Sequence, residues 1–170
     1  MRAAAPDEGC ALLLGRRHGS LLLLERIWPC CNIWQPAAER QRRFLLDPRE
    51  QLLAQRWARS QQQLVLGAAH SHPGSAAIPS ATDLSLCCGP TLMLIRSGSH
   101  DRQMASQNAG TGPQGQDQHR IRPLRAWWIP EGAGWAAGAG PDAGSDHHPA
   151  TAQELAIELD PHQRAGHLGE

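Results

Sequence analysis

The chain has 170 residues, 41% of them hydrophobic, and its 16 cationic and 16 acidic side chains give a formal net charge of zero. This length predicts a single domain, and the hydrophobic share suffices for one core. The lack of a basic excess argues against a nucleic-acid-binding protein. The apolar run 21–24 is far too short to span a bilayer, and residues 1–7 contain no apolar signal segment. We therefore expect a cytoplasmic protein without a membrane anchor.

Two apolar runs near the N-terminus, residues 10–16 and 20–27, predict a β-hairpin with His18 and Gly19 in its turn. Both runs are continuous rather than alternating, which is typical of central strands covered on both faces. Residues 28–39 contain two prolines and an asparagine and predict a loop.

A strand is predicted at residues 42–46, followed by a helix that begins at Asp47 and extends to about Ser60. Asp47 provides an N-cap acid, the next residue is proline, and a glutamate follows in the first turn. The stripe Leu52, Leu53, Arg56 and Trp57 predicts the face of this helix that packs on the core.

The next apolar run, residues 64–69, predicts a buried strand that continues into His70 and His72. Because side chains alternate along a strand, both imidazoles point to the same face, with Cα atoms about 6.6 Å apart. That arrangement suits two nitrogens bound to one metal ion. Pro73 cannot donate to a ladder and should end the strand.

A second helix is predicted to start at Ser80, with Asp83 in its first turn. This placement supplies a carboxylate as a third ligand, and three protein ligands leave one position of a zinc site open. Histidine pairs and S-x-x-D caps are each common without chemistry, but their combination favours a metal centre. Asp7, Glu8 and Glu25 are the candidates for a base that moves the proton.

Beyond this centre we expect a strand at 91–96, a polar loop at 97–119 and a final strand at 121–129. Pro123 places that last strand near an edge. A flexible Gly/Ala-rich segment should follow, with weak helical character at 150–159. The five cysteines form no C-x-x-C pair and no even set, which favours buried free thiols over zinc ligands or disulfides.

The stretch from His70 to Asp83 resembles the signature of the JAMM (MPN-plus) metalloproteases. That signature reads H-[ST]-H-P, then six residues ending in proline, then S-x-x-D. Residues 6–10 before the first strand and 43–48 before the first helix also resemble the short bacterial members. The likeness covers roughly residues 6–129.

The resemblance implies zinc ligands at His70, His72 and Asp83, an oxyanion-stabilising hydroxyl at Ser80, and Glu8 as the acid and base. It implies a cytidine-deaminase-like α-β-α sandwich, an α/β fold in which helices lie on both faces of a mixed sheet. The JAMM/MPN-plus domain would cover residues 1–130, and a flexible tail would cover 131–170.

Such proteins hydrolyse peptide or isopeptide bonds after the C-terminal glycines of ubiquitin-like proteins, and short bacterial members process small sulfur carriers. The resemblance thus implies a zinc peptidase acting on a sulfur-carrier tail. The alternative is a non-catalytic MPN-fold binding or scaffold module. A DNA-repair-associated relative is a third reading, disfavoured by the neutral charge and by Ser71 in the motif.

Overall fold

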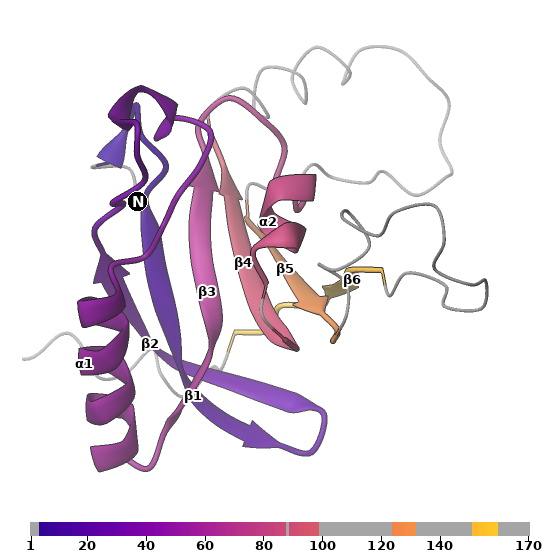
Figure 1. Ribbon diagram of the computed structural model, residues 1–170. Helices are drawn as coiled ribbons and strands as arrows, with labels where there is room; N and C mark the ends of the chain where they lie inside the picture. The colour runs from indigo at the N-terminus through magenta and orange to yellow at the C-terminus, as the bar shows by residue number, and fades with distance from the viewer. Residues whose placement is uncertain (1–3, 88, 99–123, 132–150, 160–170) are drawn as a thin grey trace, which may run out of the picture.

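The computed structural model describes residues 4–87, 89–98, 124–131 and 151–159. In this part of the chain the strands form one six-stranded sheet in the order β2-β1-β3-β4-β5-β6 (Figure 1). The strands are β1 (Cys10–His18), β2 (Leu21–Cys30), β3 (Leu64–His72), β4 (Thr91–Ser97), β5 (Leu124–Ile129) and β6 (Gln153–Leu155). The helical elements are η2 (Ala37–Glu39), α1 (Pro48–Ser60) and α2 (Ala81–Ser85). β3 and β4 are parallel and the other neighbours antiparallel, which makes the sheet mixed.

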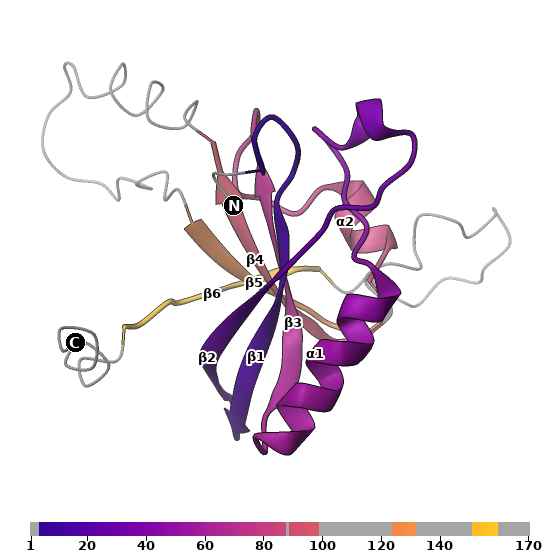
Figure 2. The same cartoon turned by 90° about the vertical axis from the view of Figure 1, so that its left-hand side faces the viewer.

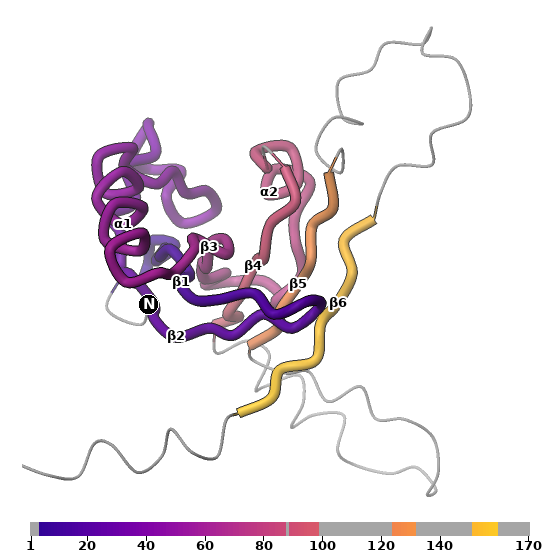
Figure 3. Tube along the Cα trace, turned by 90° about the horizontal axis from the view of Figure 1, so that it is seen from below, coloured from indigo at the N-terminus to yellow at the C-terminus, as the bar shows by residue number. Residues whose placement is uncertain are grey.

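Both described α-helices lie on the same face of this sheet (Figures 2 and 3). Strand register places Leu12, Ala68 and Met93 side by side on that face. α1 begins as predicted, because the Asp47 carboxylate accepts a hydrogen bond from the backbone N–H of Arg49. α2 packs at the other end of the face, where Leu84 contacts the cluster around Met93.

α1 packs on the sheet through small residues instead of its leucines. Ala54 and Ala58, one turn apart, are buried against Leu12 and Leu14, whereas Leu52 and Leu53 are more than half exposed. The predicted leucine stripe was therefore wrong, because the two alanines let the helix backbone approach the sheet closely. Trp57 was placed correctly, since it packs against the same cluster.

The opposite face of the sheet carries a second core, which includes Leu13, Ala69 and Leu94. The β1–β2 hairpin folds over this face, so that Leu22 and Leu24 pack against the core and the Arg17 guanidinium lies 5.6 Å from the Trp128 ring centre on β5. Figure 3 shows the hairpin passing under the sheet toward β6. The sharp bend is possible at Gly15, where a Cβ atom would meet the Leu23 carbonyl oxygen at 1.9 Å.

Two strand predictions in the N-terminal half need correction. β1 is central and buried as expected, but β2 is an edge strand with Leu21 62% exposed, because β1 pairs with β3 on its other side. The strand expected at 42–46 does not form either. Only an isolated bridge joins Asn32 to Leu46, since both edges of β1 are already occupied by β2 and β3.

The segment predicted as a weak helix at 150–159 instead contributes the edge strand β6. It pairs with β5, and the Arg125 guanidinium binds the Glu154 carboxylate with an Nε to Oε1 distance of 2.8 Å. Pairing with the free edge of β5 gives the backbone of this segment more hydrogen bonds than a single isolated helical turn would give it. Most of the predicted 97–119 loop and much of the 131–170 tail lie outside the described residues, although β6 belongs to the tail's range.

The α/β fold class with a mixed sheet is confirmed. Among the described residues, helices cover one face of the sheet, and the β1–β2 hairpin covers the other. No helix in the described ranges is long and apolar enough to cross a membrane. Cys10, Cys30 and Cys31 form no disulfide, as predicted, but only Cys10 of these three is buried and Cys31 is exposed. Cys88 lies outside the described residues.

Candidate metal centre

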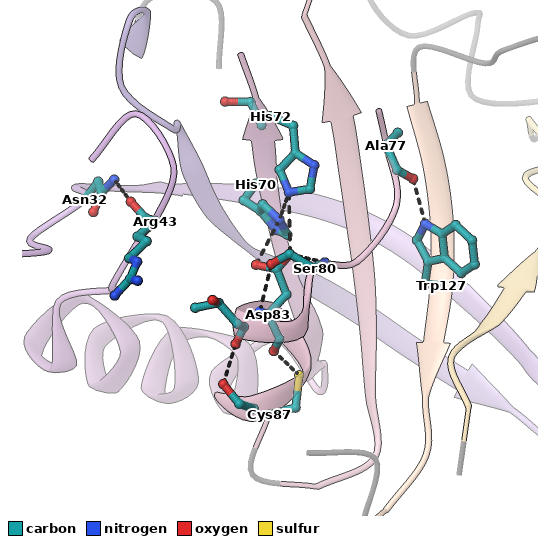
Figure 4. A network of polar contacts seen from close by, with 12 residues as sticks. Asn32, Arg43, His70, His72, Ala77, Ser80, Asp83, Cys87 and Trp127 are labelled. Carbon is teal, nitrogen blue, oxygen red and sulfur yellow. Dashed lines mark hydrogen bonds and ion pairs between the residues drawn. The ribbon is translucent and has the colours of Figure 1, made fainter. Parts of the chain in front are cut away.

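Two imidazoles and a carboxylate converge at the C-terminal end of β3 (Figure 4). The His70 and His72 Nε2 atoms are 2.9 Å apart. The Asp83 carboxylate reaches them from α2, with Oδ1 3.4 Å from His70 Nε2 and Oδ2 3.5 Å from His72 Nε2. All three side chains are buried, and their ligand atoms lie within 4.8 Å of one another. The structure thus brings together the three residues that the sequence predicted as ligands.

The spacing and hydrogen bonding of these atoms fit a tetrahedral zinc ion. Ligands at about 2.0 to 2.1 Å from a tetrahedral ion are roughly 3.3 Å apart, close to the separations found here. The His72 Nδ1 atom donates to the Ala76 carbonyl oxygen at 2.7 Å, which leaves its Nε2 lone pair directed at the centre. A donor set of two imidazoles and one carboxylate also leaves an open position, as in catalytic zinc sites.

The protonation states indicate what occupies the centre when no ion is bound. Burial lowers the pKa of His70 and keeps this ring neutral. Burial opposes ionisation of Asp83, but hydrogen bonds from both histidines bring its pKa well below the usual value. Burial also opposes charging of His72, yet Asp83 and the Ala76 carbonyl together raise its pKa. Because imidazole nitrogens bind a metal ion only when they carry no proton, protons and a metal ion compete for these two nitrogens.

Ser80 and Asp83 form a capping box that orients the carboxylate. The backbone N–H of Asp83 donates to Ser80 Oγ at 3.1 Å, and the backbone N–H of Ser80 donates to Asp83 Oδ2 at 2.7 Å. The Ser80 hydroxyl proton is not used in this box, and the residue is exposed at the rim of the centre. It is therefore available to donate to a bound molecule.

Glu8 lies directly across from His72 on the same face of the sheet. β1 and β3 pair Cys10 with His70, and the backbone N–H of Ser71 donates to the Gly9 carbonyl oxygen at 2.9 Å, which extends this register to Glu8 and His72. The Glu8 side chain is only 4% exposed. Burial raises the pKa of its carboxyl to about 7, while His72 opposes the rise and Asp83 adds to it.

The other two candidate bases lie elsewhere. Glu25 binds Arg16 and accepts a hydrogen bond from Gln63 Nε2 at 2.7 Å. Gln63 directly precedes β3, so this pair lies at the end of the strand opposite to His72. Asp7 sits in the turn before Glu8, where its backbone N–H bonds to the Ala4 carbonyl.

Asn32 holds the backbone around Glu8 and was not predicted. Its Nδ2 atom donates to the carbonyl oxygens of Glu8 at 3.1 Å and Arg43 at 2.9 Å, and its Oδ1 atom accepts from the backbone N–H of Leu45 at 3.2 Å. The same loop carries Phe44, whose ring stacks on His70 with centroids 4.5 Å apart. An asparagine in a proline-containing loop carries no sequence signal that distinguishes this role from an ordinary turn.

Three buried polar atoms near the centre have no hydrogen-bond partner among the described residues: Glu8 Oε2, His70 Nδ1 and Ser97 Oγ. Register places Ser97 beside His72 on β4, as Glu8 lies beside it on β1. Buried polar groups are rarely left unpaired in proteins. Their position around His72 agrees with a site built to hold an ion, water or substrate.

Ser71, the residue between the two histidines, points to the opposite face and ties Glu8 to β3. Its Oγ atom accepts a buried hydrogen bond from the Gly9 backbone N–H at 2.9 Å. We expect Ser71→Ala to lower the free energy of unfolding by about 1 to 3 kcal/mol, because the Gly9 N–H loses its partner. Urea denaturation of the metal-free protein measures this change. Ser71→Thr keeps the hydroxyl and is the matched control, and equal stability of Ser71→Ala and the parent would contradict the assignment.

These observations define an α/β protein with a candidate two-histidine, one-aspartate metal centre at the end of a central strand. The model of a family described as prokaryotic homologs of the JAB domain matches residues 1–110, and the chain belongs to this family. The JAB-domain family includes metallo-isopeptidases as well as non-catalytic members.

Several solved structures, including the following two, are similar to the chain. A protein of Desulfitobacterium hafniense, known from a solution structure, is 29% identical, with a TM-score of 0.60 over 94% of this chain and 82% of that one. A protein of Salinibacter ruber is 25% identical, with a TM-score of 0.49 over 94% of this chain and 82% of that one. No curated protein matched the chain.

Proposed function

We propose that this protein is a zinc-dependent peptidase or isopeptidase of the JAMM type. The proposal is supported chiefly by one observation: Glu8, a buried carboxyl, lies beside three side chains whose ligand atoms are spaced as around one tetrahedral ion. A structural zinc site is closed by four protein ligands, whereas the three converging side chains here leave one position open beside Glu8. His70, His72 and Asp83 would hold the ion, and Glu8 and Ser80 would act on the substrate.

A bound zinc ion would supply a Lewis acid that polarises the scissile carbonyl and acidifies water. Glu8 would accept the proton of the attacking water and deliver it to the leaving amine. The Ser80 hydroxyl would donate a hydrogen bond to the carbonyl oxygen as negative charge develops there. Asn32 and Ser71 would keep Glu8 in place through its backbone neighbours.

We propose as substrate the C-terminal tail of a ubiquitin-like sulfur-carrier protein, cut after its terminal glycines in the cytoplasm. The resemblance of residues 70–83 to the JAMM signature supports this choice, and membership of the JAB-domain family is compatible with it. Glycines next to the cleaved bond suit a centre whose ligands are buried, because a tail without side chains can approach such a carbonyl closely.

The proposal is tested by intact-mass spectrometry of a small β-grasp sulfur carrier that bears one extra cysteine after its terminal glycines. We expect the zinc-loaded protein to remove the mass of that cysteine, and a chelator to suppress the loss. A carrier that ends at the glycines is the substrate control. An unchanged mass with one bound zinc and retained carrier binding would instead indicate a non-catalytic binding module.

A further inference from the structure

An apolar groove of about 640 Å³ lies between α1 and α2, next to Asp83 of the candidate metal centre. The two helices stand apart on the same face of the sheet, and β3 and β4 form the floor between them (Figure 3). Asp83 is among the lining residues, as is Phe44, whose ring stacks on His70, so the groove borders the ligand set. The volume lies in the range of about 300 to 1,000 Å³ that is usual for ligand pockets.

The floor of the groove is open because a small residue occupies a central strand. Ala68 lies between Leu12 and Met93 on the helical face, two residues before His70. Although β3 is covered on both edges, Ala68 is only half-buried, whereas Ala69 on the opposite face is fully buried. A larger side chain at this position would fill part of the space along β3.

The lining of the groove is mostly apolar. Asp83 is the single charged side chain among the described residues that line the groove. Leu45 and Leu86 border it from the loop before α1 and from the end of α2, and they are 44% and 49% exposed. Apolar surface of this kind gains free energy when an apolar partner displaces water from it. The occupant should therefore be apolar and should also reach the metal centre.

We propose that the groove binds the apolar side chains of the substrate's polypeptide segment beside the bond that is cleaved. The inference rests on the proposed peptidase function and adds a selectivity: aliphatic residues near the terminal glycines are preferred over polar ones of the same shape. Its basis is an apolar groove that Asp83 helps to line. Ala68 is then a specificity-determining residue, because its size sets the depth of the groove.

The test measures binding rather than turnover. Two fluorescein-labelled peptides end in glycine-glycine, one preceded by leucine-valine and the other by the isosteric asparagine-threonine. Fluorescence anisotropy gives their affinities with zinc and with chelator. We expect the leucine-valine peptide to bind about tenfold more tightly than its polar isostere, in line with the discrimination that apolar pockets achieve. The preference should persist with chelator, since the groove lies beside the ligands rather than on them.

Two variants assign the preference to the groove. Ala68→Leu should remove it by filling the floor, and Ala156→Leu, the same change at an exposed position after β6, should leave it intact. Leu45→Asn changes an exposed border residue and should weaken only the leucine-valine peptide, so the test does not depend on how well Ala68→Leu folds. Equal affinities for the two peptides, or a preference unchanged in Ala68→Leu and Leu45→Asn, would overturn the inference.

The outcome is independent of the carrier assay. Carrier cleavage without peptide preference leaves the peptidase proposal standing and removes the groove assignment. Peptide preference without cleavage makes the groove part of a binding module and removes the catalytic proposal. A concentration-dependent dimer that Ala68→Leu dissociates, together with loss of peptide binding, would identify a second copy as the occupant and overturn the inference.

Discussion

Replacing Glu8 by glutamine is expected to reduce carrier cleavage by about 10² to 10⁴-fold, the usual contribution of a general acid-base group. Glutamine has nearly the same shape but cannot take the proton of the attacking water. Zinc should remain bound, because Glu8 is not among the three converging ligands. Glu25→Gln is the matched control, since Glu25 binds Arg16 and Gln63 at the other end of β3. Comparable losses in both variants would contradict the assignment of Glu8.

The same substitution should stabilise the metal-free protein at alkaline pH. In the folded state the pKa of Glu8 rises from the ordinary 4.5 to about 7. A carboxyl with a raised folded-state pKa is harmless below pH 4.5, costs stability as the pH rises, and reaches its full cost above pH 7. A rise of this size corresponds to roughly 3 kcal/mol. Urea denaturation with chelator should therefore show a stability gain for Glu8→Gln that grows from pH 5 to pH 8 and vanishes near pH 4.

An opposite trend, with Glu8→Gln less stable than the parent at pH 8, would mean that the carboxylate has a stabilising partner. The described residues show none for Glu8 Oε2. A functional group that lowers the stability of its own fold is common at active sites, where burial adjusts a pKa for catalysis.

Replacing Asp83 by asparagine should weaken zinc binding by more than about 100-fold. Mutating a residue that only hydrogen-bonds to a metal ligand lowers metal affinity by up to about 100-fold, and loss of a ligand itself should cost more. The amide oxygen can still accept the Ser80 backbone N–H, so the helix cap survives. What disappears is the negative charge, which hydrogen bonds from the two histidines hold ionised despite burial. Competition with a chromophoric chelator measures the change in affinity.

Asp47→Asn is the matched control for this prediction. Asp47 caps α1 by accepting a hydrogen bond from the Arg49 N–H at 2.8 Å. The same aspartate-to-asparagine change is thus made at a helix start that is remote from the ligand set. It should leave zinc affinity unchanged. Zinc affinity in Asp83→Asn equal to that of the Asp47 variant would remove Asp83 from the ligand set.

The parts of the centre that lie on regular elements could be predicted from the sequence. The alternation of a strand places His70 and His72 on one face, and the capping pattern places Asp83 on the first helical turn. Both patterns are local, so they need no knowledge of what packs where. Glu8 was one of three candidate bases and could be singled out only through family resemblance, because its position across from His72 depends on the β1–β3 register.

Features set by long-range pairing escaped prediction. β2 and β6 are edge strands because the other four strands pair with one another between them. The strand order in a sheet cannot be deduced from the residues of one strand alone. Asn32 looked like an ordinary loop residue, yet it joins the backbone of Glu8 to the loop that carries Phe44. The groove depends on Ala68 lying opposite the gap between two helices, a relation that appears only once α1 and α2 are placed.

X-ray absorption spectroscopy of the zinc-loaded protein at the zinc edge tests the metal centre most directly. The ligand set of His70, His72 and Asp83 predicts one zinc per chain, surrounded by nitrogen and oxygen atoms at about 2.0 to 2.1 Å with imidazole scattering from two histidines. Because the chain also contains five cysteines, the alternative has a distinct signature. Sulfur scattering at about 2.3 Å would show that the ion is bound by thiolates and would contradict this account.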